Sequence, residues 1–336
     1  MRYLTAVLLL TLALPAVAEE PWALHLYVEN DGAFIKPNNN TDRHYTHGTK
    51  ITFTHQPEFA DDFADCLDSF YPLGPAAERA TAFGYSFGQN IYTPANITAS
   101  VPDPGDRPYA GWLYGGAFLQ RSVADTMDYL DLTIGILGPS SQADDSQKIV
   151  HEIVDAAKPE GWDHQVPDEV GFNITYQRHW KLPLLHAVDE DGHAFLFGAE
   201  LLPQAGFTLG TMNRHVNAGA TLRAGWNLPN DFGPPRLEEP ADATHLPTDG
   251  GKLSLYGFVR LEGRLVEHDA FIEGATFRDS PGRSAEPAVG IVQVGVVATL
   301  YKFEFGYSQT FLTEQFDRQH GSDAYGAFTL AWRCKF

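Results

Sequence analysis

The sequence predicts an all-β fold, an antiparallel transmembrane β-barrel of about twelve strands with a short helix in the third outer loop. Apolar or aromatic residues alternate with polar or small ones over 216–227, 301–311 and 326–336. These segments approach the ten or so residues that a tilted spanning strand needs, and aromatic residues gather near their ends. A soluble β-sandwich also alternates, but the strand length, the aromatic girdles and a last strand ending in Phe336 favour the barrel.

Residues 1–18 are predicted to be a secretory signal peptide. Met1 and Arg2 give a basic start, and the apolar run that follows is shorter than the roughly 20 residues of a spanning helix. Ala16-Val17-Ala18 then fits a small-x-small cleavage site. Residues 19–336 are expected to form a single barrel domain without a low-complexity linker.

The alternating segments number twelve, an even count as in single-chain bacterial barrels. They are 22–30, 46–55, 82–92, 109–121, 125–137, 168–180, 192–204, 213–227, 252–266, 286–300, 301–314 and 324–336. With both ends on the periplasmic side, the outer connections are 31–45, 93–108, 138–167, 205–212, 267–285 and 315–323. The inner connections 56–81 and 228–251 are longer than such barrels prefer, and 57–70 is expected to hold a short amphipathic helix.

The composition restricts the possible partners. Acidic residues number 43 against 23 basic ones, and a formal charge of −20 argues against DNA or RNA as a ligand. The two cysteines, Cys66 and Cys334, could pair in an exported protein, or Cys334 could face lipid with the apolar residues of its strand. One sequence leaves that pairing open.

Three polar clusters are predicted to meet at the outward ends of strands one to six. They are Asn30 and Asp31 with the entry to the next strand at 43–48, Asp106 and Arg107 in the second outer loop, and Gln147 and His151 in the third. Gln147 and His151 lie four residues apart, hence on one side of a helix predicted within 146–162. Each cluster has a simpler reading, as a turn, an ion pair or a solvated histidine, but their convergence at one rim favours a reactive site.

Two other patterns carry less weight. Residues 84–88 match the Gly-x-Ser-x-Gly nucleophile elbow, but Ser86 falls in the middle of a predicted strand instead of a strand-to-helix turn. His44 and His47 make no recognisable zinc set. Asn30, Asp31 and loop carbonyls offer oxygen ligands instead, which favours a hard cation such as calcium.

Several motifs together resemble the LpxR-type lipid A 3′-O-deacylase family of outer-membrane barrels. They are VENDGAF at 28–34, TDRHYTHG at 41–48, QNIYTP at 89–94, DRPYAGWLYGG at 106–116 and the Gln-x-x-x-His helix followed by Gly161-Trp162. The resemblance covers most of the chain and is densest over 26–180. It implies a Gram-negative outer-membrane location, a site that faces the outer leaflet, and calcium-dependent removal of the 3′-acyloxyacyl group of lipid A.

The resemblance also assigns roles to residues. It implies a carboxylic ester hydrolase whose catalytic residues are Asn30, Asp31, Thr46, Gln147 and His151. Arg107 and Tyr45 are expected to contact lipid A or lipopolysaccharide, and Asp31 with Asn30 to bind the metal; we expect a monomer. The chain departs from the family where Gly32 and Ala157 replace acidic residues, and its 94–106 stretch lacks basic residues.

The expected chemistry is ester hydrolysis with a histidine base, which has a pKa suited to neutral pH. His151 would take a proton from water while a cation near Asn30 and Asp31 polarises the ester carbonyl. Thr46 would orient the water or a ligand, or act as the nucleophile, and Gln147 would support the oxyanion or the histidine. The alternatives are a calcium-dependent outer-membrane phospholipase and a non-enzymatic barrel that serves as a pore or scaffold.

Overall fold

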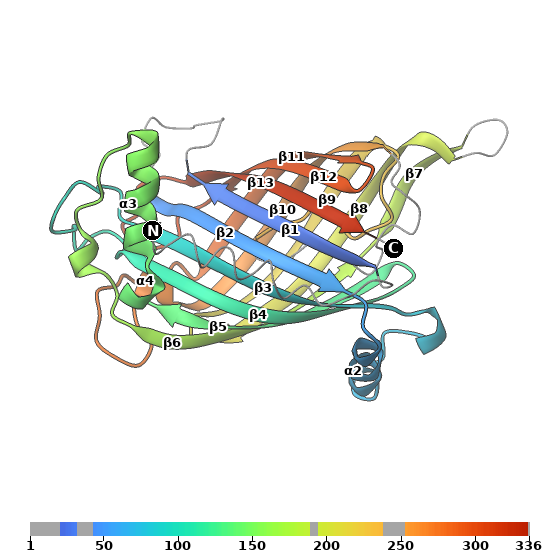
Figure 1. Ribbon diagram of the computed structural model, residues 1–336, viewed down its shortest axis with the longest axis horizontal. Helices are drawn as coiled ribbons and strands as arrows, with labels where there is room; N and C mark the ends of the chain where they lie inside the picture. The colour runs from blue at the N-terminus through green and yellow to red at the C-terminus, as the bar shows by residue number, and fades with distance from the viewer. Residues whose placement is uncertain (1–20, 32–42, 189–193, 238–252, 335–336) are drawn as a thin grey trace.

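The computed structural model describes residues 21–31, 43–188, 194–237 and 253–334, and the predicted signal peptide lies outside these residues. Within them the chain forms one antiparallel sheet of thirteen strands (Figure 1). The strands are β1 Trp22–Asn30, β2 His44–His55, β3 Ala80–Thr93, β4 Ala110–Val123, β5 Thr126–Leu137, β6 Glu169–Trp180, β7 Leu182–Val188, β8 Ala194–Gly210, β9 Asn213–Trp226, β10 Ser254–Asp269, β11 Ala288–Leu300, β12 Phe303–Leu312 and β13 Asp323–Cys334.

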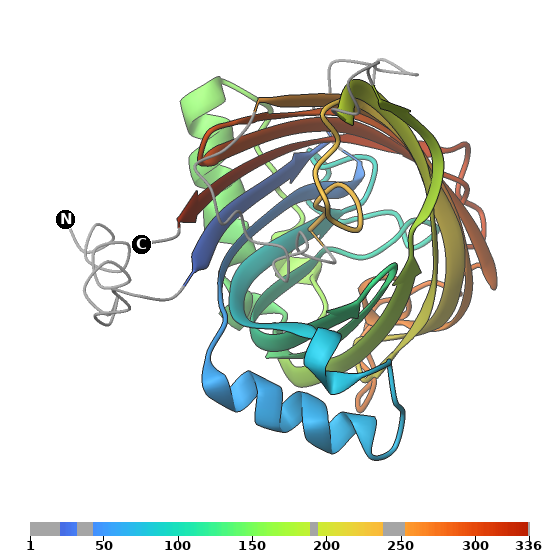
Figure 2. The ribbon, with the colours of Figure 1, turned by 90° about the vertical axis from the view of Figure 1, so that its right-hand side faces the viewer.

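Two pairings close the sheet into a barrel (Figure 2). Strand β1 pairs with β13, residues 22–30 against 326–334, and β6 pairs with β8, residues 173–179 against 204–210. Strand β7 follows β6 after Lys181 and pairs with the earlier part of β8, so β6 and β7 share one place in the wall. Thirteen strands therefore fill twelve positions, and the predicted fold class is confirmed.

Strand β7 was not expected from the sequence. The seventh strand was predicted at 192–204, whereas β8 covers Ala194–Gly210 and pairs with a strand in the supposed connection before it. The ladder between β7 and β8 shifts register between Pro183 and Leu185. A proline supplies no N–H to a ladder, so an irregular strand of this kind leaves a weak alternation signal.

The wall separates apolar from polar side chains, as alternation in a membrane barrel requires. On β1, Leu24 and Leu26 are exposed on the outer side, whereas His25, Tyr27 and Glu29 are buried. Aromatic rings gather on the outer surface near the α2 end of β1: the Trp22 ring lies 4.9 Å from that of Trp332 and 6.2 Å from that of Phe53. Apolar residues therefore face outward and polar residues face the lumen.

Short helices mark the two ends of the barrel. Helix α2, Glu58–Asp68, lies at one end with the start of β1, and α3, Ala143–Val154, and α4, Ala270–Glu273, lie at the other (Figure 1). Single 3₁₀ turns occur at Ala76–Glu78, Pro139–Ser141 and Trp162–His164. The helices expected within 57–70 and in the third outer loop are thus both present. We refer below to the α2 end and the α3 end.

No helix among the described residues is long and apolar enough to cross a membrane. The helix α2 carries Cys66, and β13 ends at Cys334. Both are free thiols, so the disulfide that the sequence left open is not formed.

Part of the long connection after β9 lies inside the barrel at the α2 end (Figure 2). Lys50 Nζ on β2 donates to the Leu237 carbonyl at 2.8 Å, and Arg236 pairs with Glu262 on β10 at 2.7 Å. Arg223, fully buried on β9, contacts Asp231 of the same segment. The length of this connection had no explanation in the sequence, and these contacts show that residues 231–237 fill part of the polar lumen.

Candidate active site

Asn30, Asp31 and Thr46 form one hydrogen-bonded unit where β1 ends beside β2. The Asn30 side-chain amide donates to the Thr46 carbonyl at 3.0 Å, and the Asp31 backbone N–H donates to the same carbonyl at 3.3 Å. The buried Asp31 carboxylate accepts the backbone N–H of Arg43 at 3.1 Å. The predicted pair at the end of the first strand is therefore tied to the hydroxyl residue of the second.

A β-bulge at Thr46 sets the direction of its side chain. Opposite β3, Tyr45 pairs with Tyr92 but His47 pairs with Ile91, so Thr46 is an extra residue without a partner in the ladder. Bulges re-aim neighbouring side chains. Here Tyr45 lines the lumen, while the Thr46 hydroxyl is hydrogen-bonded to the Thr93 hydroxyl at 2.8 Å.

Helix α3 packs on β3 and β4 with Gln147 and His151 on its buried side. Ala143, at the start of the helix, joins a cluster with Ile91 of β3 and Trp162. The Trp162 indole Nε1 donates to Gln147 Oε1 at 2.8 Å, which fixes the helix to the segment that returns to the wall. The predicted spacing of Gln147 and His151 therefore does place both on one helix face.

The imidazole of His151 is held by a backbone group. Its Nδ1 is hydrogen-bonded to the Ala157 carbonyl just beyond the helix end. A carbonyl can only accept, so Nδ1 carries the proton of the neutral ring and Nε2 is left as the basic nitrogen. The family resemblance implies a Glu at position 157. Here the backbone carbonyl of Ala157 accepts the hydrogen bond from His151 without an acidic side chain.

Four of these residues, Asn30, Thr46, Gln147 and His151, belong to one region on the outer side of the wall. Asn30 lies on the exposed face of β1 with Leu24 and Leu26. Helix α3 lies outside the barrel and crosses the strand ends there, as both ribbon views show (Figures 1 and 2). Strand β3 links the two groups, because Thr93 contacts Thr46 and Ile91 packs with Ala143.

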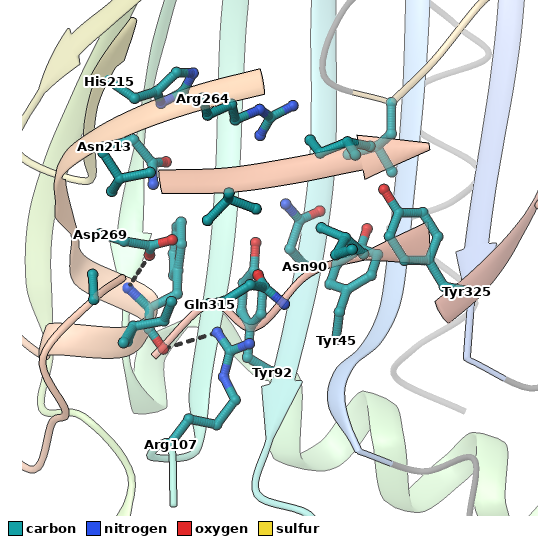
Figure 3. A pocket seen from close by; sticks show the side chains of 18 of the residues that line it. Tyr45, Asn90, Tyr92, Arg107, Asn213, His215, Arg264, Asp269, Gln315 and Tyr325 are labelled. Carbon is teal, nitrogen blue, oxygen red and sulfur yellow. Dashed lines mark hydrogen bonds between the residues drawn. The ribbon is translucent and has the colours of Figure 1, made fainter. Parts of the chain in front are cut away.

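Tyr45 and Arg107 lie elsewhere, in a cavity inside the barrel at the α3 end (Figure 3). The cavity is lined from opposite walls, by Asn90 of β3 and Arg264 of β10 among others. Tyr45 donates its hydroxyl to Glu29 at 2.7 Å. The Arg107 guanidinium stacks over Tyr92, 4.7 Å from the ring centre, and donates to the Phe271 carbonyl at 3.0 Å. The wall thus separates the two expected substrate contacts from four of the five expected catalytic residues, Asn30, Thr46, Gln147 and His151.

Ionisable residues at strand ends and in the connection before β4 contact one another at this end of the barrel. His44 bridges Asp323 Oδ2 at 2.6 Å and Asp106 Oδ1 at 3.3 Å. Burial raises the pKa of Asp106, but its hydrogen bonds to His44 and to the Ala95 N–H outweigh burial and leave that pKa below its ordinary value. Burial also lowers the pKa of the Arg107 guanidinium, although nearby carboxylates oppose the shift.

Sequence reasoning missed two residues that support the site. Thr93 binds the Thr46 hydroxyl, and Trp162 binds Gln147. Both belong to motifs that carried the resemblance, QNIYTP and the Gly161-Trp162 pair. The sequence does not show which residues these two contact. The bulge at Thr46 determines the contact between Thr46 and Thr93, and no residue type in that stretch predicts the bulge.

The donors near Asn30 fit a calcium ion in kind. Asn30 and Asp31 offer amide and carboxylate oxygens, the hard ligands that calcium prefers. Across the described ranges, however, no group of three or more His, Cys, Asp or Glu side chains could hold a metal ion. Calcium takes six to eight oxygens, so a bound ion would depend on backbone carbonyls, water or substrate for the rest.

A comparison with protein-family models identifies the family of this chain. The family model described as "Outer membrane protein LpxR" matches residues 4–334. The chain belongs to the LpxR family. No curated protein matches the sequence. Family membership and the barrel make this an outer-membrane protein and support the coarse activity that the motifs imply, lipid A deacylation.

Solved structures show the same fold. LpxR from Salmonella typhimurium matches with a TM-score of 0.74 and 20% identity, covering 92% of this chain and 99% of that one. The β domain of the Bordetella autotransporter BrkA matches with a TM-score of 0.44 and 11% identity, covering 95% and 100%. The first match establishes a shared LpxR barrel, and the second is too distant to support a statement about this chain.

Proposed function

We propose that this protein hydrolyses the 3′-acyloxyacyl ester of lipid A in the outer leaflet of the outer membrane, with His151 as the base and a calcium ion as cofactor. The α3 end would face the cell exterior, which brings the outer side of the wall to the level of the lipid A ester. The chain as a whole is acidic, so binding of the negatively charged substrate depends on local contacts at the site and not on the overall charge of the protein.

The observation that carries the proposal is the buried face of α3. His151 Nδ1 contacts a carbonyl, so Nε2 is the basic atom, and Gln147 lies one turn earlier. The Gln147 amide nitrogen, Nε2, is buried and has no hydrogen-bond partner among the described residues. A buried donor without a partner is costly in a finished fold, and it suits an oxygen that develops negative charge only during reaction.

The chain's own residues suffice to describe the proton path. His151 Nε2 removes a proton from water as the water oxygen attacks the ester carbonyl carbon. Gln147 Nε2 donates to the resulting oxyanion. When the tetrahedral intermediate collapses, the carbon–oxygen bond to the sugar breaks and His151 returns the proton to the departing alkoxide. The products are a fatty acid and a sugar hydroxyl.

The remaining residues orient the reactants. The Thr46 hydroxyl would position the attacking water, since its contact with Thr93 fixes its direction. When bound near Asn30 and Asp31, calcium would supply positive charge that polarises the ester carbonyl. Asn30 itself holds the Thr46 carbonyl, so the ion site and the hydroxyl are coupled through one peptide group.

Lipid A mass spectrometry tests the proposal. A Gram-negative host that expresses the protein should yield lipid A lighter by one acyloxyacyl group at the 3′ position, and a host without the protein should not. Phospholipids are extracted from the same cells. Unchanged lipid A together with accumulated lysophospholipid would replace the proposal with an outer-membrane phospholipase.

A non-enzymatic barrel is the other outcome. Cells whose lipid A and phospholipids both stay unchanged, while the protein is folded in the outer membrane, would refute the enzyme. Among non-enzymatic functions, a pore is less favoured than a scaffold. Residues 231–237 occupy part of the lumen, where they contact Lys50, Arg223 and Glu262.

A further inference from the structure

Helix α2 has an exposed apolar stripe that the barrel does not cover. Phe59, Phe63 and Phe70 recur at helical spacing, and the exposed Cys66 lies between them. Phe70, which follows the C-cap residue Ser69, is 83% exposed. Exposed aromatic residues that form one contiguous stripe usually mark a surface that binds something.

The opposite side of α2 is fixed to the protein. Asp65 pairs with Arg79 at 2.6 Å, and Asp68 pairs with Arg121 at 2.6 Å and also contacts Arg79. Ala60 and Ala64 are fully buried on the side that faces the barrel. These ion pairs and small residues hold the helix in one orientation, which leaves Phe59, Phe63 and Phe70 exposed.

The stripe continues the lipid-facing surface of the barrel. The Phe59 ring lies edge-on to that of Phe83, at 5.0 Å and 70°. Phe83 shares the outer face of β3 with Tyr85, whose ring stacks on His55 at 6.2 Å. Because the outer face of a spanning strand contacts lipid, the same lipid surface extends from the wall onto α2.

The helix direction also suits a membrane surface. Figure 1 shows α2 nearly end-on beside the α2 end of the barrel, and Figure 2, turned by 90°, shows it lengthwise outside the wall. Its axis therefore runs across the barrel axis, which places it parallel to the plane of a membrane that the barrel crosses. Amphipathic helices in this position bury their apolar side at the boundary between head groups and acyl chains.

We propose that α2 is a membrane-surface anchor whose Phe59, Phe63 and Phe70 side chains insert into the phospholipid leaflet at the α2 end. Its partner is a lipid surface, which already covers the adjoining Phe83 and Tyr85. The acidic side chains of α2 stay on the protein and water sides, where Arg79 and Arg121 bind two of them. The anchor would fix the depth and tilt of the barrel, and it does not depend on the proposed activity.

A nitroxide label on the natural Cys66 thiol tests this proposal. The full-length protein with Cys334→Ser is labelled, folded into vesicles of phosphatidylethanolamine and phosphatidylglycerol, and probed by electron paramagnetic resonance. Oxygen, which concentrates in lipid, and a water-soluble nickel chelate serve as the two collision partners. The control moves the label to the polar side of the same helix, as Glu58→Cys in a Cys66→Ser background.

We expect the oxygen-to-nickel accessibility ratio at Cys66 to exceed that at position 58 several-fold. In a Phe59→Ser, Phe63→Ser, Phe70→Ser variant, the Cys66 ratio should fall to the control value, which excludes insertion driven by the label itself. Equal, water-like ratios at both positions in the unmodified helix would overturn the proposal. Dipolar broadening between labels on two copies would also overturn it, because the stripe would then bind a second copy of the chain.

Discussion

The side-chain amide of Asn30 donates to the backbone carbonyl of Thr46 at 3.0 Å, which joins the ends of β1 and β2. Asp31, just beyond β1, donates its backbone N–H to the same carbonyl, so two adjacent residues position the hydroxyl residue of β2. A polar pair that resembles an ordinary turn in the sequence therefore supports one side of the candidate site.

Asn30→Asp should lower deacylation at least about tenfold. The change replaces an N–H donor by a carboxylate oxygen facing a carbonyl, and loss of one hydrogen bond with added repulsion corresponds to about 1.4 kcal/mol or more. The fraction of deacylated lipid A measures the effect. Asn227→Asp is the matched control, because Asn227 also donates to a backbone carbonyl, that of Leu253 at 2.8 Å, but at the α2 end. An equal loss in both variants would indicate a general effect on the barrel.

His151→Ala should reduce the rate by about 10²- to 10⁴-fold, the usual contribution of a positioned general base. Heat-modifiable migration on gels would show that the variant barrel is folded. His164→Ala serves as the control, since His164 is exposed on the segment that follows α3. Undiminished activity in a folded His151→Ala protein would remove the residue from the mechanism.

Thr46→Val and Thr93→Val separate the role of the Thr46 hydroxyl from that of its partner. Loss of the Thr46 hydroxyl should cost about a hundredfold in rate, whereas loss of Thr93, worth one hydrogen bond of about 1 kcal/mol, should cost about tenfold or less. Intact-protein mass spectra check the mechanism further. An acyl adduct on Thr46 during turnover would make Thr46 the nucleophile and would contradict the water-orienting role.

Trp162→Phe should loosen α3 while keeping most of the aromatic packing against Tyr109, whose ring lies 4.8 Å away. The change removes the donor to the buried Gln147 Oε1 and should destabilise the helix contact by about 1–3 kcal/mol. Faster amide exchange in α3 and reduced deacylation would report it. Trp180→Phe, on the outer wall at the α2 end of β6, should leave both unchanged.

Chelation of calcium should abolish deacylation without unfolding the barrel, and added calcium should restore it. Asp31→Asn should raise the calcium concentration needed for half-maximal activity, because it removes the carboxylate charge expected to attract the ion. Activity is titrated with calcium in the wild-type protein and in the variant. Full activity of the wild-type protein after exhaustive chelation would exclude calcium as a cofactor.

The sequence by itself determined the barrel, most of its strands and the α3 helix. A period of two residues over ten-residue stretches dictates which side chains face lipid, and that information is local. The spacing of Gln147 and His151 likewise fixed a shared helix face, as observed. Strand β7 was not predicted, because Pro183 and a shifted register obscure its alternation.

Only the tertiary structure decided what the clusters contact. A single extra residue at Thr46 sends Tyr45 into the lumen and turns the Thr46 hydroxyl toward Thr93, so neighbours in the sequence end on different sides of the wall. Arg107, placed with Asp106 at the same rim by strand order, stacks on Tyr92 inside the barrel. Strand alternation predicts a face only where the register is regular, and a bulge or a loop removes that constraint.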